Sequence, residues 1–82
     1  KKYLFDLPVR AESYFSSKEI RDVRWPEDVL VTSIRRGQQN VVATGKTIMQ
    51  TGDVLRVLTD LGLAKTVQEE LKQLEKRRLF DT

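Results

Sequence analysis

Short apolar runs separated by glycine-marked turns make up the middle of this sequence. The runs span residues 29–34, 41–43 and 54–58, and the turns between and beside them are marked by Gly37, Gly45 and Gly52. β-Branched residues crowd the runs and favour strands, whereas Gly beside Gln, Thr, Lys or Asp favours tight turns. The pattern therefore predicts a compact, mostly antiparallel β-meander.

The faces of these strands follow from the alternation of side chains. Residues 29, 31, 33 and 35 should share one face of the first run and residues 30, 32, 34 and 36 the other. Both faces are apolar at the start of this run, which predicts a central strand covered on both sides. In the last run, Val54, Arg56 and Leu58 should share one face of the strand, and Leu55 and Val57 the other.

The N-terminal residues 3–9 also alternate, which predicts a half-buried strand. Aromatic and aliphatic residues occupy positions 3, 5, 7 and 9, while Leu4, Asp6 and Pro8 share the other face. Proline cannot donate a hydrogen bond to a neighbouring strand, so Pro8 indicates an edge position. Leu4, the apolar residue on the polar face, is a candidate for a dimer interface.

Two helices are predicted. Ile20 and Val23 are three residues apart, and Ser16 with Glu19 forms a possible capping box for a short helix over residues 17–23. It should end at Trp25, because the residue before a proline is disfavoured in the helical region. Trp25 is interpreted as a lid on the core, with a ligand-stacking or interface role as the alternative.

A longer C-terminal helix is predicted over residues 63–78 from apolar positions recurring every three or four residues. Phe80, which follows it, either folds back or meets a partner. The fold class is thus α+β, with one short helix after the first strand and one long C-terminal helix. The 82 residues form one domain, residues 1–82, which we interpret as cut from a longer protein because it begins Lys-Lys and its one Met is Met49.

Composition argues against catalysis. The chain has neither Cys nor His, so it lacks the commonest general base, the thiolate nucleophile and the commonest transition-metal ligands. Its carboxylate pairs lie in charged stretches with no apolar pocket to raise a pKa. We expect no catalytic residue, no metal and no resident cofactor. The 15 basic and 12 acidic residues are interleaved, which is a weak signal for nucleic acid.

Arg35 and Arg36 beside Asn40 form the most suggestive polar cluster, since guanidinium groups bind phosphate and an amide can read a base edge. Consecutive strand residues point opposite ways, so one arginine at most should serve a given pocket. The alternative is a solvated hairpin tip. Arg56 lies mid-strand, where it either keeps an exposed sheet edge from pairing or meets an acidic residue across a subunit contact.

These residues resemble a known family. The Lys18-led helix, the Arg35-Arg36-Gly37 turn, Gly45-x-Thr47 and Gly52-Asp53-Val54-Leu55 are similar to the TrkA-C domain, the C-terminal half of RCK (regulator of potassium conductance) modules. The similarity runs from about Tyr3 to Leu58. The chain departs from the family at Ala43, often Pro, at Lys46, often Asp or Asn, and at Ser17, a frequent Gly position. The family's nucleotide-binding half is not in this sequence, so binding of NAD or ATP is not implied.

The resemblance implies a regulatory homodimer on the cytoplasmic side of a membrane, attached to a transmembrane channel or transporter. Some relatives bind cyclic di-AMP or another small ligand at the two-fold interface. The amino-acid sequence of residues 6–9, 25–28 and 33–37 is most similar to the version of the domain attached to bacterial voltage-gated chloride channels. Potassium uptake systems and carboxylate or amino-acid transporters are the alternatives. Leu4, Trp25, Arg56 and Phe80 are the predicted dimer-interface residues.

Two other functions stay open. One is a purely structural dimerisation module without a ligand, driven by apolar surface at Leu4, Trp25 or Phe80. The other is a small nucleic-acid binder using Arg10, Arg35 and Arg36, although no aromatic stacking platform accompanies these charges.

Overall fold

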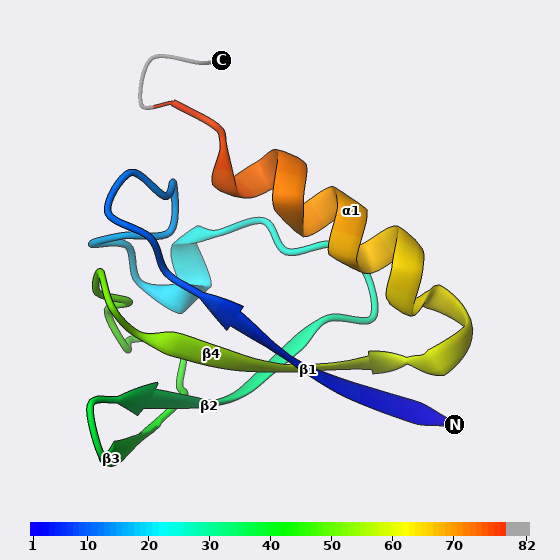
Figure 1. Ribbon diagram of the computed structural model, residues 1–82, viewed down its shortest axis with the longest axis horizontal. Coiled ribbons are helices and arrows are strands. Elements are labelled where there is room, and N and C mark those ends of the chain that lie inside the picture. Colours follow the sequence, from blue (N-terminus) through cyan, green and yellow to red (C-terminus); the bar gives the residue numbers. More distant parts are fainter. Residues whose placement is uncertain (79–82) are drawn as a thin grey trace.

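The computed structural model describes residues 1–78, which form a four-stranded antiparallel sheet, an α-helix and two 3₁₀ turns (Figure 1). In chain order the elements are β1 (Lys2–Pro8), η1 (Ile20–Asp22), β2 (Leu30–Arg36), β3 (Gln39–Val42), β4 (Val54–Asp60), η2 (Leu61–Leu63) and α1 (Ala64–Glu75). The predicted α+β class, with its antiparallel sheet and C-terminal helix, is confirmed.

The strand order is β1-β4-β2-β3, so the last strand of the chain lies between the first and the second. β1 and β3 are therefore the edges, which confirms the edge position indicated by Pro8. The order departs from a simple meander, in which β4 would pair with β3. The hairpin of β2 and β3 turns at Gly37, whose φ of +62° favours glycine.

β2 does not keep the predicted alternation along its whole length. The pairing of β2 with β4 shifts register between Val31 and Ser33, which places Thr32 in a bulge where its hydroxyl donates a hydrogen bond to the Arg56 carbonyl. The bulge lets Val31 and Ile34 both face the core, although they are three residues apart. The prediction that β2 is covered on both sides is wrong: Leu30, on the opposite face, is 59% exposed.

Both predicted helices are shorter than the sequence pattern indicated. The short helix over residues 17–23 is a single 3₁₀ turn, η1, and no capping box forms, because the Ser16 hydroxyl bonds to Thr51 instead. Backbone hydrogen bonds tie residues 17–21 to residues 45–49 and include an isolated β-bridge between Glu19 and Ile48. The long helix ends at Glu75 rather than residue 78. Phe80 lies outside the described residues.

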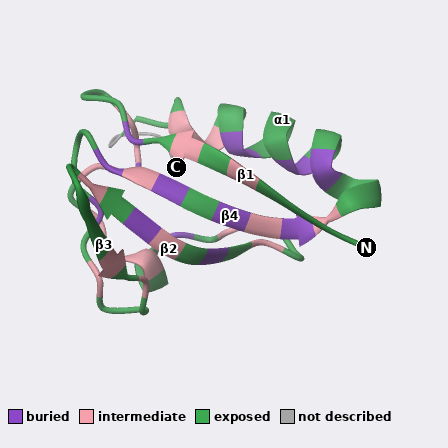
Figure 2. Ribbon diagram, turned by 60° about the horizontal axis from the view of Figure 1, so that its bottom comes forward, coloured by how far each residue is buried: buried purple, intermediate pink, exposed green. Residues whose placement is uncertain are grey.

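The core lies between one face of the sheet and a layer made of α1 and the η1 loop (Figures 1 and 2). In Figure 2 a buried stripe on α1 faces the sheet, and Val67 and Leu71 provide it. Phe15, which is fully buried, stacks on Trp25 at 5.0 Å between ring centroids. The other buried hydrophobic residues are Val9, Val23, Val31, Ile34, Met49, Leu55, Val57 and Ala64.

Candidate functional site

The sheet face opposite α1 is open, and we call it the open face. Strand register places Leu4 of β1, Leu58 of β4 and Leu30 of β2 in one row across it. Leu4 is 51% exposed and Leu30 59%, because no element of residues 1–78 covers this side (Figure 2). An apolar row left in water favours contact with another protein surface.

A charged row lies next to the leucines on the open face. Arg56 is opposite Asp6 on one side and Ser33 on the other, and its Nε lies 3.4 Å from Asp6 Oδ1. The interpretation of Arg56 as a guard for an exposed edge is wrong, since β4 is an inner strand with partners on both sides. Its acidic partner belongs to the same chain, and both side chains remain about half exposed.

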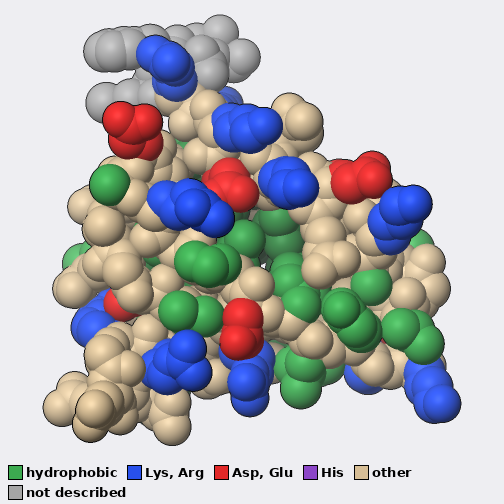
Figure 3. Space-filling model, viewed as in Figure 1, with side chains coloured by type: hydrophobic (Ala, Val, Ile, Leu, Met, Phe, Trp, Pro, Cys, Tyr) green, Lys and Arg blue, Asp and Glu red, His purple; other side chains and the backbone are tan. Residues whose placement is uncertain are grey.

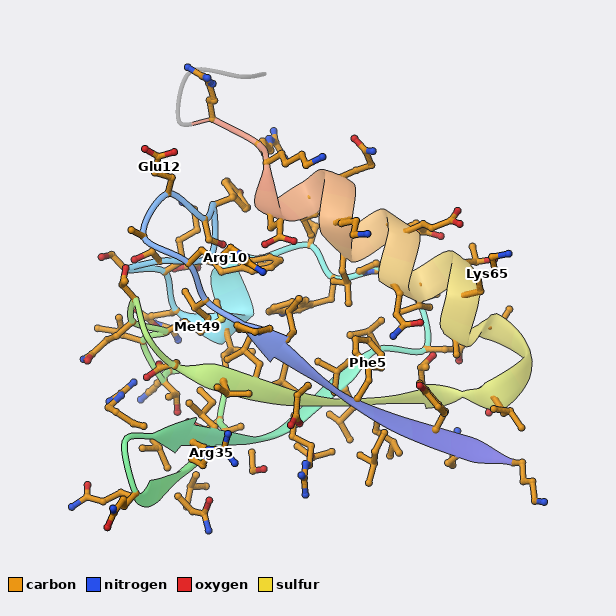
Figure 4. The ribbon with its side chains drawn as sticks, viewed as in Figure 1. Phe5, Arg10, Glu12, Arg35, Met49 and Lys65 are labelled. Carbon is orange, nitrogen blue, oxygen red and sulfur yellow. The ribbon has the colours of Figure 1, made fainter. Side chains whose placement is uncertain are left out.

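Arg35 and Asn40 lie directly opposite each other on β2 and β3 and extend the open face towards the hairpin. Both are exposed, and Val54 of β4 is the neighbour of Arg35 on the other side. Figure 4 shows Arg35 at the hairpin end of β2, away from α1. The structure thus brings together Arg35, Asn40, Leu4 and Arg56 on one surface.

Arg36 points to the opposite side of the sheet. Its Nε and Nη2 donate hydrogen bonds to the two carboxylate oxygens of Asp53, both at 2.9 Å, and Nη2 also donates to the Ile48 carbonyl at 3.0 Å. Asp53 is 1% exposed and accepts a further bond from the Gln50 amide. This bidentate pair fastens the loop before β4 to the end of β2.

The pKa values of the pair follow from this geometry. Hydrogen bonds from Arg36 hold the pKa of Asp53 below its ordinary value; burial opposes the shift, and the Gln50 amide adds to it. The same side-chain hydrogen bond raises the pKa of Arg36 above its ordinary value. Both groups therefore stay charged near neutral pH, and the Arg36 guanidinium is occupied within its own chain.

Trp25 lies half-buried against the core, as the lid interpretation predicted. Its ring stacks on Phe15, and its Nε1 donates a hydrogen bond of 2.9 Å to the Ile20 carbonyl. It belongs to the layer that carries η1, so it lies on the other side of the sheet from Leu4 and Arg56.

Residues 1–78 contain neither a cluster of metal-binding side chains nor a helix that could span a membrane. Their acidic side chains form no group of three or more that would hold a metal ion. In the same range, α1 is the one α-helix, and its twelve residues are too few and too polar for a membrane span.

The family model of the TrkA-C domain matches residues 4–72. The chain belongs to the TrkA-C domain family. This confirms the resemblance and agrees with the expectation of a regulatory rather than catalytic role, because TrkA-C domains are typically regulatory domains of ion-transport proteins.

Solved structures support the same assignment. Fourteen chains match, among them a structure described as "Structure of RCK domain with cda". The TrkA-C chain is 26% identical to it with a TM-score of 0.69, and the match covers 88% of this chain and 96% of that one. No curated protein matches the sequence.

Sequence reasoning missed two parts of the site. Leu30 and Leu58 were assigned to their strands, but their alignment with Leu4 depends on which strands pair, and this cannot be read from local patterns. The role of Asp53 was also missed, although Gly52-Asp53 before an apolar run is a typical turn signal. Asp53 comes directly before β4, and Arg36 is the last residue of β2. These two positions were the indication of an ion pair that the sequence offered.

Proposed function

We propose that this TrkA-C domain regulates an attached ion channel or transporter from the cytoplasmic side by forming a homodimer through its open face. The observation that carries the proposal is the apolar row of Leu4, Leu58 and Leu30, in which Leu4 and Leu30 are exposed and Leu58 is half-buried. The apolar row and the adjacent charged row are suited to a two-fold contact, in which each surface patch meets its own copy. Asp6 of one protomer can then approach Arg56 of the other, so the charges complement each other as well.

The dimer is tested by placing a charge in the leucine row. Leu4→Glu is expected to weaken self-association at least tenfold, because about 1.4 kcal/mol or more is lost when a carboxylate enters an apolar contact. Sedimentation-velocity centrifugation across a dilution series measures the change. The matched control is Leu61→Glu, which alters a leucine of similar exposure, 49%, in η2. A wild-type chain that stays monomeric throughout, or equal weakening by both variants, refutes the open-face dimer.

A small phosphate-bearing ligand is proposed to bind at the edge of this dimer, where Arg35 and Asn40 lie. The guanidinium provides a planar fork for a phosphate, and the amide offers a donor and an acceptor for a base edge. Cyclic di-AMP is a candidate through the family resemblance. A ligand that binds one dimer geometry better than another shifts the attached channel by that difference in affinity.

The ligand proposal is tested by thermal shift of the wild-type domain against a nucleotide panel that includes cyclic di-AMP. A stabilising ligand is expected to lose at least about tenfold in affinity with Arg35→Gln, since a charged hydrogen bond is worth roughly 1.5–3 kcal/mol. Arg24→Gln, which removes an exposed arginine elsewhere, should leave the affinity unchanged. If a dimer forms but no nucleotide shifts its unfolding at saturating concentration, the domain is the structural module without a ligand.

A chloride channel is the proposed transport partner, with a potassium system as the second candidate. The support is the similarity of residues 6–9, 25–28 and 33–37 to the chloride-channel version of the domain. Flux of chloride and potassium through liposomes containing the full parent protein, with and without Leu4→Glu, distinguishes the two. Loss of regulation for one ion and not the other identifies the transported species.

A further inference from the structure

A basic concavity lies on the opposite side of the molecule from the open face, and we call it the basic basin. One wall is the loop of residues 10–18, and the other is the C-terminal end of α1 with the residues that follow it. Its volume is about 1390 Å³. In Figure 3, Lys and Arg side chains gather over this end of α1 and the facing loop, and Figure 4 shows Arg10 beneath the end of the helix.

The charge of the basic basin exceeds that of the whole chain. Six basic and two acidic residues line it, a formal charge of +4, against +3 for all 82 residues. The acidic pair is Glu12 and Glu75. Within residues 1–78, three of the six basic residues, Arg10, Lys72 and Lys76, make no hydrogen bond or ion pair through their side chains. A concentrated field of one sign attracts an anion.

Tyr14 fixes two of the cations. Lys18 Nζ lies 4.0 Å from the centre of its ring, and Arg77 Cζ lies 5.4 Å from the same centre, so both walls of the basin contact one aromatic side chain. The Tyr14 amide also donates a hydrogen bond of 2.9 Å to the Glu75 carbonyl, which ties the loop to the helix end. Cations that are already positioned cost less conformational entropy when a ligand binds.

From this arrangement we propose that the basic basin binds an anion carrying several phosphates. Basic groups on both walls, spread over a wide concavity, suit a multiply charged ligand better than a single halide ion. The Tyr14 ring is covered by cations, so recognition rests on phosphates rather than on base stacking. The ligand is either a free polyphosphate or the phosphorylated headgroup of a membrane lipid. This site is separate from Arg35 and Asn40 and is independent of dimerisation through the open face.

Calorimetric titration of the 82-residue chain with inorganic tripolyphosphate tests the free anion. Lys72→Gln/Lys76→Gln is expected to lower the affinity about tenfold, with each exposed charge contributing a few-fold. Lys46→Gln/Lys65→Gln removes the same charge outside the basin and should change the affinity less than about twofold. The affinity should also fall as salt is added.

Co-sedimentation with vesicles tests the lipid source. Vesicles of phosphatidylcholine containing a phosphorylated phosphatidylinositol are compared with vesicles of phosphatidylcholine alone. Binding to the phosphorylated vesicles that is lost in Lys72→Gln/Lys76→Gln and kept in the control supports a headgroup. Amide chemical shifts that change in residues 13–18 and 72–77, and not at Arg35 or Asn40, confirm the location. No binding to either probe, or equal loss in both double variants, overturns the proposal.

Discussion

Phe15→Ala is expected to destabilise the TrkA-C domain by about 4 kcal/mol, because it leaves a cavity in the core. Phe15 is fully buried, and its ring stacks on Trp25 in the layer that carries η1. A domain of this size has roughly 5–10 kcal/mol of stability, so about half of that stability is lost. Chemical denaturation followed by Trp25 fluorescence measures the change, since this is the one tryptophan of the chain.

The control for Phe15→Ala is Tyr3→Ala, which removes an aromatic ring of similar size from β1. Tyr3 is 37% exposed and contacts Phe5 at the rim of the sheet. Its loss should cost less than about 1.5 kcal/mol. If the two variants were equally stable, the packing of Phe15 and Trp25 would not be the centre of the core.

Local patterns predicted the elements of this fold better than their arrangement. The alternation along residues 3–9 predicted β1, and Pro8 placed it at an edge of the sheet. The spacing of Val67 and Leu71 predicted α1. Each of these signals depends only on residues that are close together in the sequence. The insertion of β4 between β1 and β2 depends on contacts between residues far apart in the sequence. The bulge at Thr32 changes the side-chain alternation through one extra residue, and β-branched composition gives no sign of it.

In the candidate site, too, local patterns predicted some features and missed those that depend on distant contacts. The rule that consecutive strand residues point to opposite faces separated Arg35 from Arg36, and the structure places them on opposite sides of the sheet. The sequence could not predict which of the two arginines is free to bind a ligand. Arg36 is occupied because Asp53, in the loop before β4, forms an ion pair with it. Arg56 was interpreted as a guard for an exposed sheet edge, but β4 is an inner strand of the sheet. The strands that flank β4 could not be assigned from the sequence.

Asp53→Ala is expected to cost about 3 kcal/mol of stability, because it leaves the Arg36 guanidinium without its bidentate partner. It also removes the acceptor of the Gln50 amide and so loosens the loop before β4. Denaturant unfolding measures the loss. Asp60→Ala is the control: its ion pair with Lys2 is exposed, and the loss should be below about 1 kcal/mol. Equal costs would contradict the structural role of the Asp53 pair.

The pH dependence separates the charge of Asp53 from its packing. Because the pKa of Asp53 is lowered in the folded state, the unfolded chain takes up this proton first as the solution is acidified. The contribution of Asp53 to stability is therefore complete above the ordinary aspartate pKa of about 4 and is lost as the pH falls towards the lowered value. Below about pH 4, the difference in unfolding free energy between the wild-type domain and Asp53→Ala should shrink. A difference that stayed constant over this range would mean that the carboxylate acts through its shape and not through its charge.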